Sequence, residues 1–260
     1  MRRPLFLGLV TGLIAALAGC IPSAPDAPRG FAFRVPPATT YDLTRAKPLT
    51  PEEQAQRLQG VRLLFVGEHH DEARSHAAQL ELLQTLQSRG RLITVALEMF
   101  PPDADGALDE WRQGRLEEAE FLERSGWYES WGHPWRYYRS LFIWFREQQI
   151  PLRGVNVDKA TRIAARVDKP QDLPQATQEE VGDLREVLEP HRDFLLAQLR
   201  SAGHAGDLNP DSPQFKSFLR VQMLWERAMG RRAARLAEEL PPNGIVVVLI
   251  GSGHLGYKLG

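Results

Sequence analysis

Acidic, amide and imidazole side chains follow four short apolar runs, at the points where those runs end. Glu68 and His70 come directly after the first run, and Glu98 follows the second. Asn156 follows the third run, and His254 follows the fourth. Carboxylates and imidazoles gathered in one place can transfer protons or bind zinc, manganese or iron. These five residues are therefore the first candidates for chemistry in the chain.

The four apolar runs span residues 62–66, 92–97, 151–155 and 245–250. They are rich in Val, Ile and Leu, and helical patterns separate them, which is typical of buried parallel strands. In open parallel sheets, ligands bind outside the carboxyl ends of the strands. The sequence therefore predicts an α/β fold with a mainly parallel sheet flanked by helices in three layers. We expect the candidate groups to lie at one edge of that sheet.

Two Gly-x-x-His segments, at residues 67–70 and 251–254, suggest how two histidines converge. We expect both glycines to take unusual backbone angles at sharp turns, where only glycine is unstrained. The two imidazoles would then meet beside Glu98, which predicts a site that either binds a metal through His70, Glu98 and His254 or acts on water. In a hydrolase of this kind Glu68 would be the general base. The predicted catalytic set is Glu68, His70, Glu98 and His254.

Aromatic residues between 127 and 145 recur at steps of three and four, which predicts one aromatic face on a helix or helix pair. Pro134 is expected to interrupt or start a helix there. Such a face is either part of the core or a surface for a flat aromatic ligand. In the second case His133, Tyr137 and Tyr138 are candidate binding residues.

Helical patterns between about residues 161 and 240 predict a helical cap inserted before the last strand. Gln222 and Glu226 share one face of its final helix at a step of four. Glu226 is expected either in the cleft or in an ion pair with a nearby arginine. With Asn156, these two residues complete the predicted binding set.

The first residues predict export and lipid attachment. Two arginines precede an apolar run that ends in Leu17-Ala18-Gly19-Cys20. The run is too short to span a bilayer and has the length of a signal-peptide core. We therefore expect a signal peptide over 1–19 and lipidation of Cys20 by fatty acyl chains such as palmitate. Because Ile21 follows in place of Asp, we expect an outer-membrane lipoprotein facing the periplasm.

Residues 20–48 are rich in Pro and Ala, which predicts an extended tether between the lipid and the domain. Cys20 is the only cysteine, so an internal disulfide is excluded. The net charge of −1 gives no indication of a nucleic-acid partner.

Together, these motifs resemble the ChaN-like haem-binding uptake proteins, which are related to the Tiki/TraB and erythromycin-esterase superfamily. The likeness extends over about residues 50–260 and depends on several motifs in order. They are Gly67-Glu68-His69-His70-Asp71 with His76 and Gln79, Ala96-Leu97-Glu98-Met99-Phe100, Trp131, Tyr138, Asn156, Gln222 to Met229, and Gly251-Ser252-Gly253-His254. One departure is Glu226, where the family pattern usually has Asp.

The resemblance implies that residues 49–260 form one α/β domain with a helical cap that binds haem for iron uptake. It also implies a homodimer that shelters haem between subunits and an outer-membrane haem receptor as partner. His133, Tyr137 and Tyr138 are the candidate axial or flanking groups of haem, and Arg136 or Arg139 would pair with its propionates. The alternative function is a metal-dependent hydrolase of protease or esterase type, which uses the His and Glu residues at the strand ends.

Overall fold

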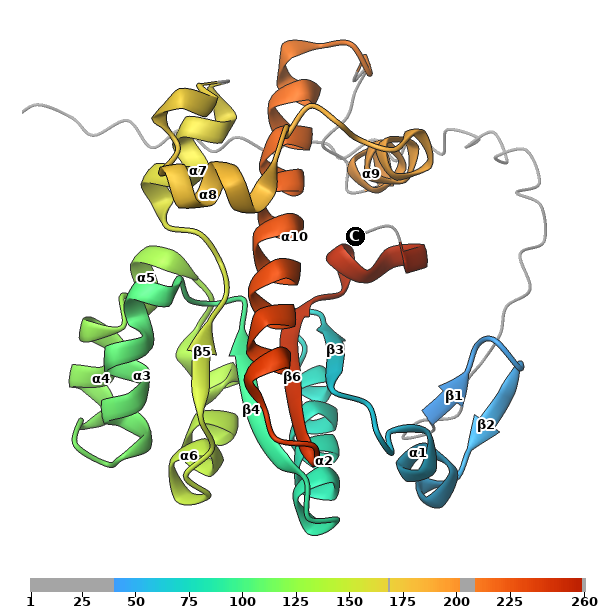
Figure 1. Cartoon of the computed structure of the whole chain (residues 1–260), viewed down its shortest axis with the longest axis vertical. Helices are drawn as coiled ribbons and strands as arrows, with labels where there is room; N and C mark the ends of the chain where they lie inside the picture. Colours follow the sequence, from blue (N-terminus) through green and yellow to red (C-terminus); the bar gives the residue numbers. More distant parts are fainter. Residues whose placement is uncertain (1–39, 168, 202–208, 259–260) are drawn as a thin grey trace, which may run out of the picture. The chain divides into compact units, whose positions relative to one another are not determined.

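The computed structural model describes residues 40–167, 169–201 and 209–258, and it divides into one unit up to Thr50 and a second from Pro51 (Figure 1). In the first unit, β1 (Thr40–Asp42) pairs antiparallel with β2 (Lys47–Leu49). Asp42 Oδ1 accepts hydrogen bonds from the backbone of the turn between them. Residues 40–48 therefore form a hairpin in place of the extended chain predicted there. The rest of the predicted tether, the predicted signal peptide and Cys20 lie outside the described residues.

The second unit is built on a four-stranded parallel sheet in the order β3-β6-β4-β5. These strands are β3 (Leu63–Glu68), β4 (Leu92–Leu97), β5 (Leu152–Gly154) and β6 (Gly244–Gly251). All four predicted strands are present, and their parallel pairing confirms the predicted α/β fold. Every residue of β6 is buried, because this strand lies between β3 and β4 and is covered on both faces.

Alternate residues of the strands face two separate layers of helices. On one face, Val95 and Val247 belong to a core formed with α2 (Ala73–Ser88), α3 (Asp105–Arg112) and α6 (Arg139–Glu147). On the other face, Ala96 and Val248 pack with the second half of α10 (Pro213–Glu239). Figure 1 shows α10 crossing one face of the sheet and α2 lying behind it. The fold therefore has three layers.

The aromatic segment forms three short helical pieces in place of one continuous face. They are α5 (Trp127–Ser130), the 3₁₀ turn η2 (Trp135–Tyr137) and α6. The left-handed Gly132 and Pro134 separate the first two pieces. Most of the rings are buried and pack against one another in the core, whereas Trp131 and Tyr137 are partly exposed.

Between β5 and β6, the described residues form four α-helices. They are α7 (Lys159–Arg166), α8 (Gln175–Val181), α9 (Glu189–Ser201) and α10. Phe215 and Leu224 of α10 centre a separate apolar cluster that α7, α8 and α9 complete. Pro190 lies in the first turn of α9, where proline costs no hydrogen bond. The remaining helices are α1 (Pro51–Arg57), α4 (Glu118–Arg124), η1 (Pro102–Ala104), η3 (Pro170–Asp172) and η4 (Ser252–Lys258).

A helix with the length and apolar character needed to cross a membrane is not found in the described part of the chain.

Candidate functional site

The polar groups at the strand ends lie along the carboxyl edge of the sheet. Glu68 is the last residue of β3, and Glu98 follows β4 directly. Gly251 ends β6, and His254 lies in η4, the turn that follows. Because β6 lies between β3 and β4, residues from the two ends of the domain become neighbours.

Glu68 is a buried carboxylate surrounded by donor groups. Its Oε1 accepts a hydrogen bond from Tyr138 Oη at 2.5 Å and lies 2.9 Å from His70 Nδ1. Its Oε2 accepts one from Gln79 Nε2 at 2.8 Å, and His76 Nε2 lies 3.5 Å away, which is long for a hydrogen bond but close enough for attraction. Burial acts to raise the pKa of Glu68, but the hydrogen bonds, first that of His70, outweigh it and hold the pKa well below its usual range. Glu68 is therefore ionised at neutral pH.

This environment does not fit the predicted role of Glu68 as a general base. The Glu68 side chain is 0% exposed, and both of its oxygens already have donors. It can instead hold the ring of His70 by Nδ1, which leaves Nε2 for other contacts. Burial acts to lower the pKa of His70, but the hydrogen bond to Glu68 and the charges of Glu98 and Glu68 produce a net rise. Glu68 is thus a positioning residue for His70.

Gly251 is required because His70 lies against it. A Cβ atom on Gly251 would lie 2.8 Å from His70 Cε1 and 2.9 Å from His70 Nε2, which real structures do not tolerate. Neither Gly67 nor Gly251 has a positive φ, so the prediction of unusual backbone angles at these glycines is wrong. The physical reason for Gly251 is close approach of a side chain, not backbone freedom.

His254 joins two carboxylates at the end of β6. Its Nε2 lies 3.3 Å from Glu98 Oε1, and its Nδ1 lies 3.3 Å from Glu226 Oε1. The other oxygen of Glu226 lies 3.4 Å from Nε2 of the buried His191 on α9. Burial acts to lower the pKa of His254, but Glu226 and Glu98 raise it to about 9. At neutral pH, His254 is therefore an imidazolium between two acidic groups, and Glu226 pairs with histidines, not with an arginine.

A cavity of about 410 Å³ opens at this edge of the sheet. Among its walls are His70, Glu98 and His254, which the structure therefore brings together. The other walls come from the segment 125–131, the start of α7 and Trp225 of α10. The lining residues are His70, Glu98, Met99, Pro101, Ser125, Gly126, Glu129, Ser130, Trp131, Asn156, Val157, Asp158, Lys159, Arg162, Trp225 and His254.

The three candidate haem-binding residues of the aromatic segment have different environments. Tyr138 is 0% exposed, and burial together with Glu68 raises the pKa of its hydroxyl. Tyr137 is partly exposed, and its hydroxyl accepts a hydrogen bond from Arg136 at 3.3 Å. His133 packs beside His70, with 4.9 Å between the ring centroids. Burial and the charge of His70 lower the pKa of His133, so that its imidazole is neutral at neutral pH.

The two predicted amide residues, Asn156 and Gln222, have different positions relative to the cavity. Asn156 lines the cavity, but its Nδ2 donates to the backbone oxygen of Glu98 at 2.8 Å and its Oδ1 accepts from Val157. It therefore fixes the chain around Glu98. Gln222 is not among the lining residues, and its buried Oε1 has no hydrogen-bond partner among the described residues.

A comparison with protein-family models matches residues 54–260 to the family described as haem-binding uptake, Tiki superfamily, ChaN. This chain belongs to the ChaN family. The match covers nearly the whole second unit, and it confirms the resemblance inferred from the motifs. A search of curated proteins finds no relative of the chain.

The fold of this chain is shared with one solved structure of a ChaN protein, and two further structures are similar to a smaller degree. ChaN of Campylobacter jejuni, described with cofacial haem binding, is 19% identical and has a TM-score of 0.66, covering 85% of this chain and 82% of that one. An erythromycin esterase EreC mutant in its open conformation is 14% identical with a TM-score of 0.40, covering 78% of this chain and 64% of the other. A Bacillus cereus protein is 13% identical with a TM-score of 0.42, covering 80% and 62%.

Sequence patterns alone did not indicate Lys159 and Arg162, which line the cavity at the carboxyl edge. One signal was present, since Asp158 followed by Thr161 is a typical helix start. Asp158 accepts a hydrogen bond from Thr161 N at 2.8 Å and begins α7 directly after the β5 end. A correct prediction of where α7 begins would have placed Lys159 and Arg162 near the carboxyl edge of the sheet.

The predicted metal set of His70, Glu98 and His254 stays a prediction. The described residues contain no group of three His, Cys, Asp or Glu side chains arranged to hold a metal ion. In this ChaN-family domain His70 contacts Glu68, whereas His254 lies between Glu98 and Glu226.

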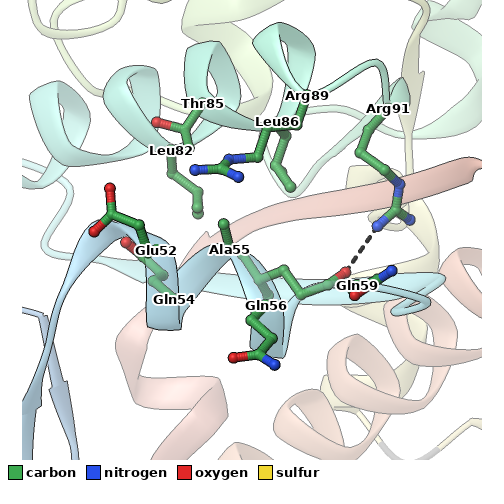
Figure 2. Close-up of a pocket in the computed structure, with 11 residues that line it drawn as sticks. Glu52, Gln54, Ala55, Gln56, Gln59, Leu82, Thr85, Leu86, Arg89 and Arg91 are labelled. Carbon is green, nitrogen blue, oxygen red and sulfur yellow. Dashed lines mark hydrogen bonds between the residues drawn. The ribbon is translucent and has the colours of Figure 1, made fainter.

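A second cavity of about 360 Å³ lies between α1 and the end of α2 (Figure 2). Its walls combine apolar groups such as Leu82 and Leu86 with glutamines of α1 and of the turn that follows it. Arg91, at one end, donates to the Leu58 carbonyl at 2.8 Å and to three more backbone carbonyls. Its guanidinium therefore links the segment after α1 to the start of β6. None of the predicted site residues lies in this cavity.

Proposed function

We propose that this ChaN-family protein binds haem and takes part in haem-iron uptake. The observation that carries the proposal is the family match over residues 54–260, whose description names haem-binding uptake. The shared fold with ChaN of Campylobacter jejuni, described with cofacial haem binding, supports it. The candidate binding surface is the partly exposed part of the segment 131–137.

Within that segment, Tyr137 fits ferric haem best. Haem supplies an iron with an axial position that a tyrosine oxygen or an imidazole can fill. The guanidinium of Arg136 lies 4.8 Å from the Tyr137 ring centroid and donates to its hydroxyl, so a cation lies beside the oxygen that would bind iron. Neutral His133 keeps a lone pair for iron and is the second candidate. Tyr138 fits poorly, because it is buried and donates to Glu68.

Of the two arginines predicted to pair with propionates, Arg136 is the more available. Arg139 Nε lies 2.7 Å from Glu118 Oε2, so its charge is already paired. Arg136 is exposed, and its interactions are with the Tyr137 ring and hydroxyl. A propionate can therefore approach Arg136 without displacing a carboxylate.

We expect haemin added to a soluble form that begins at Ile21 to give a saturable, shifted Soret band. Tyr137→Phe should abolish that shift or weaken haemin binding at least about tenfold, because it removes the ligand oxygen. His133→Ala should have a smaller effect. Tyr128→Phe is the matched control, since Tyr128 is an exposed tyrosine nearby at 58% exposure. Unchanged spectra in both Tyr137→Phe and His133→Ala would contradict this ligand assignment, and no saturable shift at all would contradict haem binding.

We also propose that the protein forms a homodimer that shelters haem between its subunits. An outer-membrane haem receptor would supply this haem. The support is the family's uptake role together with a ligand candidate that lies at the surface and not in a closed pocket. Mass measurement of the haem-loaded form by light scattering tests the dimer. A monomer with one saturating haem would exclude shelter between subunits.

Lipid anchoring at Cys20 completes the proposed function, with the domain held at the outer membrane and facing the periplasm. Its support is the signal-like run and the single cysteine that ends it. We expect Cys20→Ala to release the processed protein from the membrane fraction into the soluble fraction. A control change at Ser23 should leave it in the membrane. Membrane fractionation of the processed Cys20→Ala protein would refute lipid attachment.

A second candidate function is hydrolysis in the 410 Å³ cavity. The specific observation is that Glu68 holds Nδ1 of His70, which is the arrangement that orients a general base. Glu98 and His254 would then act on water or hold a zinc, manganese or iron ion beside it. We expect any esterase activity to fall by about a hundredfold or more in His70→Ala and to persist in His133→Ala. Equal activity in the two variants would exclude His70 as the base.

A further inference from the structure

The cavity at the carboxyl edge has unlike charges at its two ends. Lys159 and Arg162 lie at the start of α7, whereas Glu98 and His254 lie at the strand ends. We propose that this cavity binds a small molecule with an anionic carboxylate or phosphate group on a flat apolar body. The anionic group would lie at the α7 end, and a neutral end of the molecule would lie against the strand ends.

The α7 end supplies two positive charges that are free to bind an anion. Lys159 and Arg162 are three residues apart and therefore share one face of the helix. No ion pair joins either of them to a carboxylate within residues 40–167, 169–201 and 209–258. The nearest acid in sequence, Asp158, is occupied by the Thr161 backbone at 2.8 Å and the Thr161 hydroxyl at 3.0 Å. A guanidinium beside an ammonium is a typical partner for carboxylate or phosphate oxygens.

The strand-end side of the cavity disfavours a second anion. Glu98 Oε2 accepts a hydrogen bond from Gly251 N at 2.5 Å, and Oε1 lies 3.3 Å from His254 Nε2. The other ring nitrogen of His254, Nδ1, lies 3.3 Å from Glu226 Oε1, so two carboxylates meet at this one imidazole. A like charge placed here would be repelled, whereas a neutral carbonyl or hydroxyl can accept or donate a hydrogen bond. The charges therefore fix the orientation of the molecule.

The walls between the two ends are aromatic and apolar. The ring centroids of Trp131 and His70 lie 4.6 Å apart, with an interplanar angle of 81°. Those of Trp225 and His254 lie 6.1 Å apart, with an interplanar angle of 88°. Met99 and Pro101 add apolar surface. Indole rings bury large areas against flat partners. A volume of about 410 Å³ lies within the usual range for small-molecule pockets, which favours a compound of one or two rings.

This inference does not depend on haem binding. Tyr137 and His133, the proposed haem ligands, are not among the residues that line the cavity. Loss of one activity can therefore be measured while the other is retained.

Three compounds with the same ring test the proposal: 4-nitrobenzoate, 4-nitrophenyl phosphate and the neutral 4-nitrobenzamide. Binding to the soluble form is measured by calorimetry and by quenching of tryptophan fluorescence. We expect at least one anion to bind saturably and about tenfold more tightly than the amide. Comparison of the two anions identifies whether carboxylate or phosphate is preferred. Equal affinity for all three compounds, or no saturable binding of either anion, would overturn the proposal.

Variants locate the anionic group. Arg162→Gln should weaken the preferred anion about tenfold and leave the amide unchanged. Arg166→Gln is the matched control, because Arg166 lies one turn further along α7, is exposed and does not line the cavity. Glu129→Gln should tighten anion binding, because Glu129 places a like charge on the same cavity. An Arg162→Gln protein that melts like the parent and binds the anion unchanged would overturn the proposal.

A haemin titration of the same proteins separates this site from the proposed haem site. Arg162→Gln should keep the haemin spectrum, and Tyr137→Phe should keep anion binding. If saturating haemin displaces the anion competitively in the parent protein, the cavity belongs to the haem site and the inference of a separate ligand is wrong.

Discussion

Replacing Glu68 by Gln should lower the free energy of unfolding by about 3 kcal/mol or more. The carboxylate accepts hydrogen bonds from Tyr138 and Gln79 and holds His70, all in a buried position. A glutamine amide offers only one acceptor oxygen, so at least one buried donor group would meet another donor. Leaving a buried polar group without a partner costs about 1–3 kcal/mol, and the lost charge interactions add to this.

The measurement is urea unfolding at neutral pH, followed by circular dichroism. Glu81→Gln is the matched control, because Glu81 is an exposed glutamate on α2, the helix that supplies Gln79. The control should change the free energy of unfolding by less than about 0.5 kcal/mol. If Glu68→Gln is as stable as the control, the buried cluster does not stabilise the domain and the positioning role of Glu68 fails with it.

A rise in pH should remove about 3 kcal/mol of stability that His254 contributes when charged. The pKa of His254 is raised from 6.5 to about 9 in the folded protein. Folding therefore favours the protonated form, and this stabilisation is complete below about pH 6.5 and is lost as the pH rises through 9. The raised pKa of His70 acts in the same direction.

Unfolding free energies from about pH 6 to about pH 9.5 test this window, which lies below the titration of most lysines and tyrosines. His254→Gln should be less stable at the acidic end and should lose much less stability as the pH rises. His69→Gln, a change at an exposed histidine, should keep the parent's slope. A His254→Gln protein with the parent's full slope would show that another group carries the pH dependence.

The sheet was predictable from sequence because its signal is local. The runs at 92–97 and 245–250 are apolar on both faces, and such runs are buried strands wherever helices separate them. Helix boundaries around Gly132 and Pro134 were less predictable, because aromatic spacing alone does not reveal a left-handed glycine. The hairpin at 40–49 was missed since Pro and Ala dominate the composition around it.

Within the site, residue types were predictable but their partners were not. Their positions after strands correctly placed Glu68, Glu98 and His254 at one edge of the sheet, because the carboxyl ends of parallel strands lie on the same side. The sequence could not show that Tyr138 reaches Glu68, since that contact depends on how α6 packs against the sheet. The pairing of His254 with Glu226 likewise depends on where α10 crosses the sheet.

The position of β6 has a consequence for how the chain acquires its structure. β3 and β4 both pair with β6 and not with each other, although β6 is the last of the described strands in sequence. While the ribosome is still making residues before Gly244, the earlier strands lack the neighbour that completes their hydrogen bonds. Pairing across such sequence distances is slow, because a long loop must close first. The four-stranded sheet can therefore be completed only after residues 244–251 have been made.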